Sequence, residues 1–204
     1  MARPVNANAD ETRGRILHAA IGLFAGHGFH GASTRELAAL ANVNVATISY
    51  YFGGKQGLYE ATVDEVYRRL ADRTQAALAS ASLNDVGALI GGLYAAARSE
   101  RDGVRVLVRE VLDHGRLTPH TEAKHFLPGV GKLSELAAGA LGCSPAHALT
   151  GIVALGYLLS RYVIQDDASL KAALGARTAK EAHQRVVATL VATARALLSP
   201  SKKD

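Results

Sequence analysis

The chain has 204 residues, of which 49% are hydrophobic and 20% charged, a composition typical of a globular protein and not of a disordered one. The single cysteine excludes an intramolecular disulfide framework and any zinc site built on several thiolates. The net charge of +5 permits an anionic partner without demanding one. The five basic and three acidic residues of segment 1–55 do not single that segment out.

The most apolar stretch, residues 148–159, is shorter than the roughly 20 residues that a membrane span needs. The N-terminal residues lack the apolar core of a signal peptide. We therefore expect a soluble cytoplasmic protein with no membrane partner.

Nearly every segment has helical periodicity, so the predicted fold class is all-α with about nine helices. Residues 1–9 are predicted to form a flexible arm, and the first helix is expected over residues 10–27, where Gly28 can end it. Its apolar stripe consists of Ile16, Leu17, Ala20, Leu23 and Phe24.

Two short helices are predicted next. The first begins after Ser33, whose spacing to Glu36 is that of a capping box. The second begins after Asn44, a residue type favoured at helix N-termini, and continues to about Phe52. Two short helices with a turn of three or four residues between them form a helix-turn-helix.

The rest of the chain is predicted to be a helical bundle. A long helix is expected over residues 55–80. Residues 166–177 form a connection with room for one short helix, and residues 199–204 a flexible tail. Further helices are expected over residues 84–99, 103–115, 119–142 (interrupted near Pro128), 145–165 and 178–198.

The second short helix has small side chains on its exposed side, which allows a helix to lie deep in the major groove of DNA. Tyrosine hydroxyls at its C-terminal end and the ammonium of Lys55 can reach phosphates, as can the free amides at the start of the preceding helix. The predicted DNA-binding residues are Ser33, Thr34, Asn44, Val45, Ala46, Thr47, Tyr50, Tyr51 and Lys55.

Residues 28–58 resemble the DNA-binding head of the TetR family of bacterial transcriptional regulators. The resemblance rests on Gly28-Phe29, on Arg-Glu-Leu-Ala at residues 35–38, on the turn at residues 41–44, on Tyr51-Phe52, and on Lys55 with Leu58. The family usually has glycine at position 42 and serine or threonine at position 44, where this chain has Asn42 and Asn44. Ser49 stands where a tyrosine is usual, which resembles a subset that includes CecR-like regulators.

The resemblance implies a repressor that binds a palindromic operator as a homodimer and is released by a small ligand. The implied domains are a DNA-binding head (residues 10–54) and a ligand-binding and dimerisation body (residues 55–198). The dimer is expected to form through residues 145–165 and 178–198, where Leu190 and Leu197 belong to a broad apolar seam.

The inducer itself is unknown and is expected to be small and largely apolar. The predicted ligand-binding residues are Tyr94, Arg109, Asp113, Phe126 and Tyr157. Two alternatives stay open: the glycines of the body permit close helix packing instead of a pocket, and Arg109 with Asp113 forms an i,i+4 pair without a ligand.

Neither a cofactor nor a metal site is predicted. His114, His120 and His125 match no compact ligand motif, and no catalytic set is recognisable, so we do not expect an enzyme. The alternative function is a helical interaction protein whose helix-turn-helix no longer binds DNA.

Overall fold

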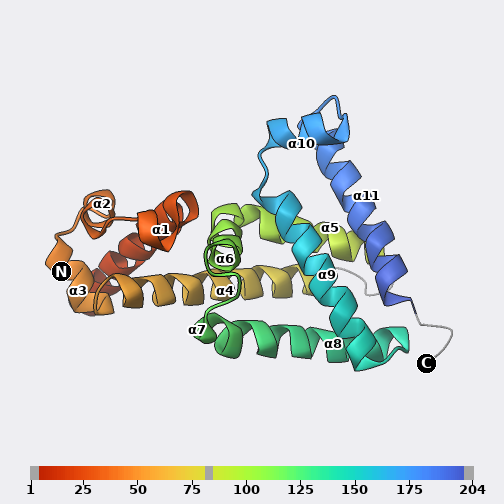
Figure 1. Ribbon diagram of the computed structural model, residues 1–204, viewed down its shortest axis with the longest axis horizontal. Helices are drawn as coiled ribbons and strands as arrows, with labels where there is room; N and C mark the ends of the chain where they lie inside the picture. Colours follow the sequence, from red (N-terminus) through yellow and green to blue (C-terminus); the bar gives the residue numbers. More distant parts are fainter. Residues whose placement is uncertain (1–4, 81–84, 200–204) are drawn as a thin grey trace. The chain divides into compact units, whose positions relative to one another are not determined.

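The computed structural model describes residues 5–80 and 85–199, and it is all-helical over these residues, as predicted (Figure 1). The helices are α1 (Val5–Gly31), α2 (Thr34–Leu40), α3 (Val45–Phe52), α4 (Lys55–Ser80), α5 (Val86–Ser99), α6 (Arg101–His114), α7 (Pro119–Thr121), a π-helical segment η1 (Glu122–Phe126), α8 (Leu127–Leu141), α9 (Pro145–Ile164), α10 (Asp167–Leu174) and α11 (Ala179–Leu198).

Two helix boundaries differ from the prediction, and most of one predicted segment is not described. α1 begins at Val5, inside the predicted flexible arm, and residues 1–4 lie outside the described residues. The interruption expected at Pro128 lies instead at the π-helical segment 122–126, because proline is readily accommodated in the first turn of α8. The predicted tail lies outside the described residues except for Ser199.

The chain forms two compact units. Unit 1 contains the described residues up to 69 together with residues 102–121, and unit 2 contains residues 70–101 and the described residues from 122 onward. The start of α4 and most of α6 therefore pack with the head. The division into a head of residues 10–54 and a body stays a prediction about function.

The core of unit 1 is built from the apolar faces that the sequence indicates. Phe24 and Leu37 are completely buried and Ile48 is 1% exposed, as expected for the interior of the head. Burial of each such side chain stabilises the fold by about 1.5–3 kcal/mol. Tyr59 packs edge-on against the ring of Phe24 at 5.1 Å, which joins α4 to this core.

A buried carboxylate ties α6 to α7 within unit 1. Glu110 is 1% exposed, and it accepts hydrogen bonds from the hydroxyls of Thr118 (2.7 Å) and Thr121 (2.9 Å). The Glu110 charge also adds to burial in raising the pKa of Tyr67 to about 12. Both hydroxyls donate to the same carboxylate oxygen, Oε1, so they compensate only part of the cost of burying this group.

In unit 2, α11 packs against α9, α10 and α5, and α8 packs against α9. α9 and α11 approach closely at Gly151, where a Cβ atom would lie 2.6 Å from a methyl group of Leu198. Arg98 of α5 donates to the carbonyls of Val163 (2.7 Å) and Gln165 (2.6 Å) and pairs with Asp167. These bonds satisfy carbonyls left free at the C-terminal end of α9.

The Glu65 carboxylate of α4 makes the free energy of unfolding vary with pH in the acid range. Hydrogen bonds from Arg68 and Arg69 lower its pKa from 4.5 to about 2, with the bond from Arg68 as the largest cause. A lowered folded-state pKa stabilises the protein above the unfolded-state value and loses this contribution as the pH falls toward the folded-state value.

We therefore expect Glu65→Gln to lower the free energy of unfolding at neutral pH by about 1 kcal/mol, a figure reduced for solvent screening because Arg68 is largely exposed. The difference from the parent should shrink as the pH falls from about 4.5 to about 2. Urea unfolding across this pH range measures it. A difference that is the same at every pH would contradict the assigned role of Glu65.

Candidate nucleic-acid interface and ligand groove

Helix α3 is fixed at both ends by residues that the sequence indicates. The Asn44 side chain accepts a 2.8 Å hydrogen bond from the amide of Thr47, and Gly53 ends the helix in a left-handed conformation with φ of 71°. At the start of α2, the Ser33 hydroxyl accepts a 3.2 Å bond from the amide of Arg35. Both short helices therefore begin at the predicted caps.

The exposed face of α3 is mostly small and ends in an aromatic residue. Val45 is 40% exposed, Ala46 and Ser49 are exposed, and Tyr50 is 83% exposed, whereas Ile48 on the opposite face is buried. Ser49 was not among the predicted DNA-binding residues, although its hydroxyl lies on the same exposed face. The helical spacing from Val45 to Ser49, four residues apart, is the signal that identifies it.

Thr47 differs from its neighbours because its side chain belongs to the cap. Its hydroxyl donates a 2.9 Å hydrogen bond to the Asn44 side chain, and the residue is half-buried. Because the hydroxyl is used in the cap, the methyl group of Thr47 is the part of the side chain that can contact a base. A role of this residue in DNA binding stays a prediction.

Two further predicted contacts lie beyond the exposed face of α3. Tyr51 is half-buried, with its ring edge-on to Tyr50 at 5.2 Å. Lys55, in the first turn of α4, has its ammonium 4.7 Å from the centre of the Phe29 ring and 3.5 Å from the carbonyl oxygen of His30. Such a cation–π contact limits the positions that the ammonium can take.

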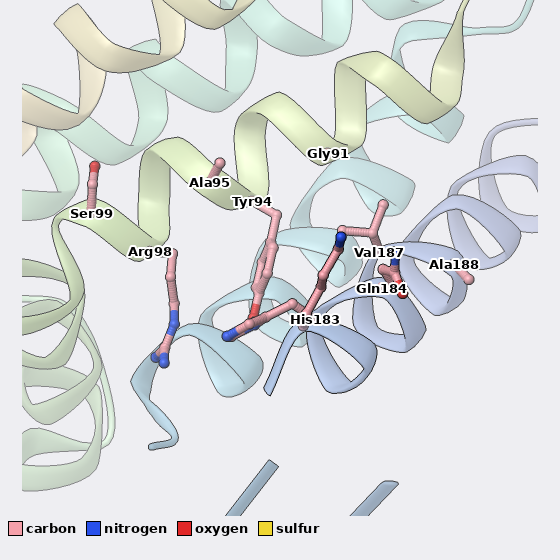
Figure 2. Close-up of a pocket in the computed structure, with 10 residues that line it drawn as sticks. Gly91, Tyr94, Ala95, Arg98, Ser99, His183, Gln184, Val187 and Ala188 are labelled. Carbon is pink, nitrogen blue, oxygen red and sulfur yellow. The ribbon is translucent and has the colours of Figure 1, made fainter. Parts of the chain in front are cut away.

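In unit 2, a groove with a cavity volume of about 830 Å³ lies between α5 and α11 (Figure 2). Figure 2 shows the side chains of Tyr94 and His183 meeting between the two helices, where the Tyr94 hydroxyl is 2.8 Å from His183 Nδ1. Asp167 lies 3.2 Å from the other ring nitrogen of His183. Burial raises the pKa of Tyr94, which keeps this hydroxyl neutral and able to donate. The lining residues are Gly91, Tyr94, Ala95, Arg98, Ser99, Lys180, His183, Gln184, Val187 and Ala188.

Comparisons with known proteins agree on the head. Residues 16–62 match the family described as "Bacterial regulatory proteins, tetR family". Over 71 residues, 35% of this chain and 34% of the relative, the chain is 45% identical to "Probable HTH-type transcriptional regulator YttP" of Bacillus subtilis. Over 59 residues, 29% of this chain and 28% of the relative, it is 39% identical to the HTH-type transcriptional repressor NicS of Pseudomonas putida. Residues 16–62 are thus a DNA-binding head of the TetR type.

The TetR-type fold extends over the whole chain. The crystal structure of a TetR-like transcriptional regulator from Rhodococcus sp. RHA1 superposes with a TM-score of 0.65 at 19% sequence identity. It covers 97% of this chain and 98% of that chain. The two sequence matches, in contrast, span only about a third of the length of YttP and NicS. The named relatives are described as transcriptional regulators, in agreement with the expectation that this chain is not an enzyme.

The five predicted ligand-binding residues are not brought together. Tyr94 lines the groove, whereas Phe126 and Tyr157 do not, and Tyr157 is 62% exposed on α9. Arg109 and Asp113 belong to unit 1, where Arg109 donates to backbone carbonyls of α1. Their i,i+4 spacing indicates that both side chains lie on one face of α6. It does not reveal that this face contacts the backbone carbonyls of α1.

The apolar seam predicted for dimerisation divides between the interior and the surface. Leu190 is 1% exposed and belongs to the interior of unit 2, so it is not available to a second chain. α9 is 20 residues long, and its most apolar part has a mean hydropathy of 1.3, so it is long and apolar enough to cross a membrane by length and composition alone. Only 17% of this most apolar part is buried within the chain. Leu149 (38% exposed) and Tyr157 lie on its outer side.

Proposed function

We propose that this protein is a TetR-family transcriptional repressor that binds a palindromic DNA operator as a homodimer and is released by a small, largely apolar ligand. The observation that carries the proposal is the exposed face of α3, on which small residues lie beside the strongly exposed Tyr50. In a helix-turn-helix, this second helix enters the major groove and its N-terminal residues meet base edges.

Base contacts are assigned to α3 and to Asn44, the residue that caps its N-terminus. The methyl groups of Val45 and Ala46 fit apolar contact with thymine, and Asn44 and Ser49 offer polar groups. Contacts to phosphates are assigned to Ser33 and Thr34 at the start of α2, to Tyr50 and Tyr51, and to Lys55. This function places the protein in the cytoplasm, where bacterial DNA is found.

The ligand is assigned to the groove between α5 and α11. Gly91, Ala95, Val187 and Ala188 supply apolar surface and space, and the Tyr94–His183 pair supplies polar anchors. Such a lining suits an apolar molecule that carries a polar group. Release of DNA then requires that the ligand bind two conformations of the dimer with different affinities. That NicS is named a repressor supports the direction of control.

The dimer is assigned to the outer faces of α9 and α11. α9 exposes Leu149 and Tyr157, and α11 exposes a row of small residues that includes Ala192 and Ala196. Two copies related by a two-fold axis would cover these faces in a four-helix arrangement. Two α3 helices are then presented to the two halves of a palindrome.

Selection of binding sequences from a pool of random duplex DNA tests the DNA-binding role. The purified full chain should enrich an inverted repeat, because a two-fold dimer reads the same half-site twice. The alternative, a helical interaction protein that no longer binds DNA, predicts no enriched sequence. Failure to enrich any sequence at low salt, where phosphate contacts are strongest, would overturn the proposal.

Lys55→Ala should weaken binding to the selected duplex and to unrelated duplexes alike, because an ammonium–phosphate contact carries no base information. Its loss should reduce the slope of log K against log salt by about one unit. Thr47→Ala is the matched comparison, since this change should alter base preference with little effect on the slope. Fluorescence anisotropy titrations at four or five salt concentrations measure both effects. An unchanged slope for Lys55→Ala would remove Lys55 from the phosphate contacts.

A further inference from the structure

Helix α1 is interrupted where it meets α6. Gly28 has φ of 69° and ψ of 179°, outside the helical region, so α1 is broken three residues before it ends at Gly31. In an uninterrupted helix the carbonyls of residues 25 and 26 would accept from the amides four residues later. Here the Arg109 guanidinium of α6 donates to both, from Nε to Ala25 at 2.7 Å and from Nη2 to Gly26 at 2.6 Å.

A second residue of α6 lies against the same break. A Cβ atom on Gly28 would lie 2.8 Å from a carboxylate oxygen of Asp113 and 3.7 Å from Nη1 of Arg109. The positive φ is what favours glycine at this position, because the Asp113 carboxylate is the end of an exposed side chain that can rotate away. Arg109 and Asp113 stand one turn apart on α6, so one face of that helix contacts the break in α1 with two charged side chains.

The two residues that follow the break contact the Lys55 side chain. The Phe29 ring packs edge-on against Tyr59 at 5.2 Å and lies 4.7 Å from the Lys55 ammonium. The carbonyl of His30, the next residue, lies 3.5 Å from the same ammonium. The two residues that follow Gly28 therefore supply two contacts to the ammonium of Lys55.

We propose that Arg109 is a positioning residue for DNA binding. Its planar guanidinium holds two adjacent carbonyls of α1 and so fixes the angle at Gly28. This angle in turn places Phe29 and His30 under the Lys55 ammonium. The inference rests on the proposed function only in assigning Lys55 to a phosphate. The structural part of it, the fixing of residues 26–31 by Arg109, is independent of DNA.

A double-mutant cycle tests the coupling between Arg109 and Lys55. The affinities of the parent, Arg109→Ala, Lys55→Ala and the double variant are measured on the duplex that the parent selects. Arg109→Ala alone should weaken binding about tenfold, and Lys55→Ala should cost at least about threefold less in the Arg109→Ala background than in the parent. Arg109→Lys should not restore the parent affinity, because one ammonium does not reproduce the two-pronged geometry. Additive effects would overturn the proposal.

Amide hydrogen exchange without DNA provides the second readout. Arg109→Ala should speed exchange in residues 26–31 about tenfold or more, while the thermal transition stays cooperative. Arg105→Ala is the control, since Arg105 is on the same helix and its ion pair is with Asp102, at 3.6 Å. If exchange in Arg109→Ala is unchanged, the positioning role is wrong, whether or not the protein selects a DNA duplex. If no duplex is selected, only the proposed function is wrong.

Discussion

Among all Gly→Ala substitutions in this chain, Gly57→Ala should disrupt the head most. A Cβ atom at Gly57 would lie 1.9 Å from the carbonyl oxygen of Phe52, a backbone atom that cannot rotate away. The next residue, Leu58, is completely buried, which prevents α4 from moving outward to relieve the overlap. The turn between α3 and α4 must therefore distort.

We expect Gly57→Ala to lower the free energy of unfolding by about 2–4 kcal/mol and to abolish sequence-specific binding to DNA. Gly22→Ala is the matched control: it lies within α1, nothing lies within 4 Å of its added Cβ atom, and the exchange should stabilise the helix by up to about 1 kcal/mol. Thermal unfolding of the two variants compares them. Equal transition temperatures for Gly57→Ala and the parent would show that the turn adapts at no cost.

Tyr157→Asp should convert the proposed dimer into a folded monomer. Tyr157 is 62% exposed, so a carboxylate there costs little within one chain but would be buried without a partner at the interface assigned to α9. The loss should reach several kcal/mol of association free energy, enough to shift the dissociation constant by at least about a hundredfold. Analytical ultracentrifugation measures this shift.

Two matched variants separate association from folding. Leu136→Asp changes a residue of α8 that is 61% exposed and lies outside the assigned interface, so the dimer should persist. Leu190→Asp changes a residue that is 1% exposed, and it should unfold unit 2. A Tyr157→Asp variant that sediments as the parent does would exclude the outer face of α9 from the interface.

The helices of the head could be predicted from the sequence because their signals are local. Asn44 and Ser33 act as caps within a few residues of their own positions, and Gly28 breaks α1 at the residue where the sequence predicts its end. Apolar periodicity also identified Phe24 and Ile48 as interior residues. None of these inferences requires knowledge of a distant segment.

What could not be predicted depends on tertiary partners. Leu190 lies on an apolar stripe, but a stripe does not reveal whether its own chain or a second chain covers it. Arg109 was placed beside a ligand because the backbone carbonyls that it binds, 83 and 84 residues away, leave no trace in side-chain patterns. His183 was missed because its partner Tyr94 is 89 residues distant.

The number of chains bound to each DNA duplex distinguishes a dimer that reads a palindrome from other modes of binding. A fluorescently labelled duplex containing the selected sequence is titrated with the full chain and followed by sedimentation velocity, beside a duplex that carries a single half-site. We expect two chains on each inverted repeat, and we expect the affinity to fall by at least about a hundredfold when one half-site is scrambled. Equal affinity for the intact, the scrambled and an unrelated duplex would contradict a repressor that reads a palindrome.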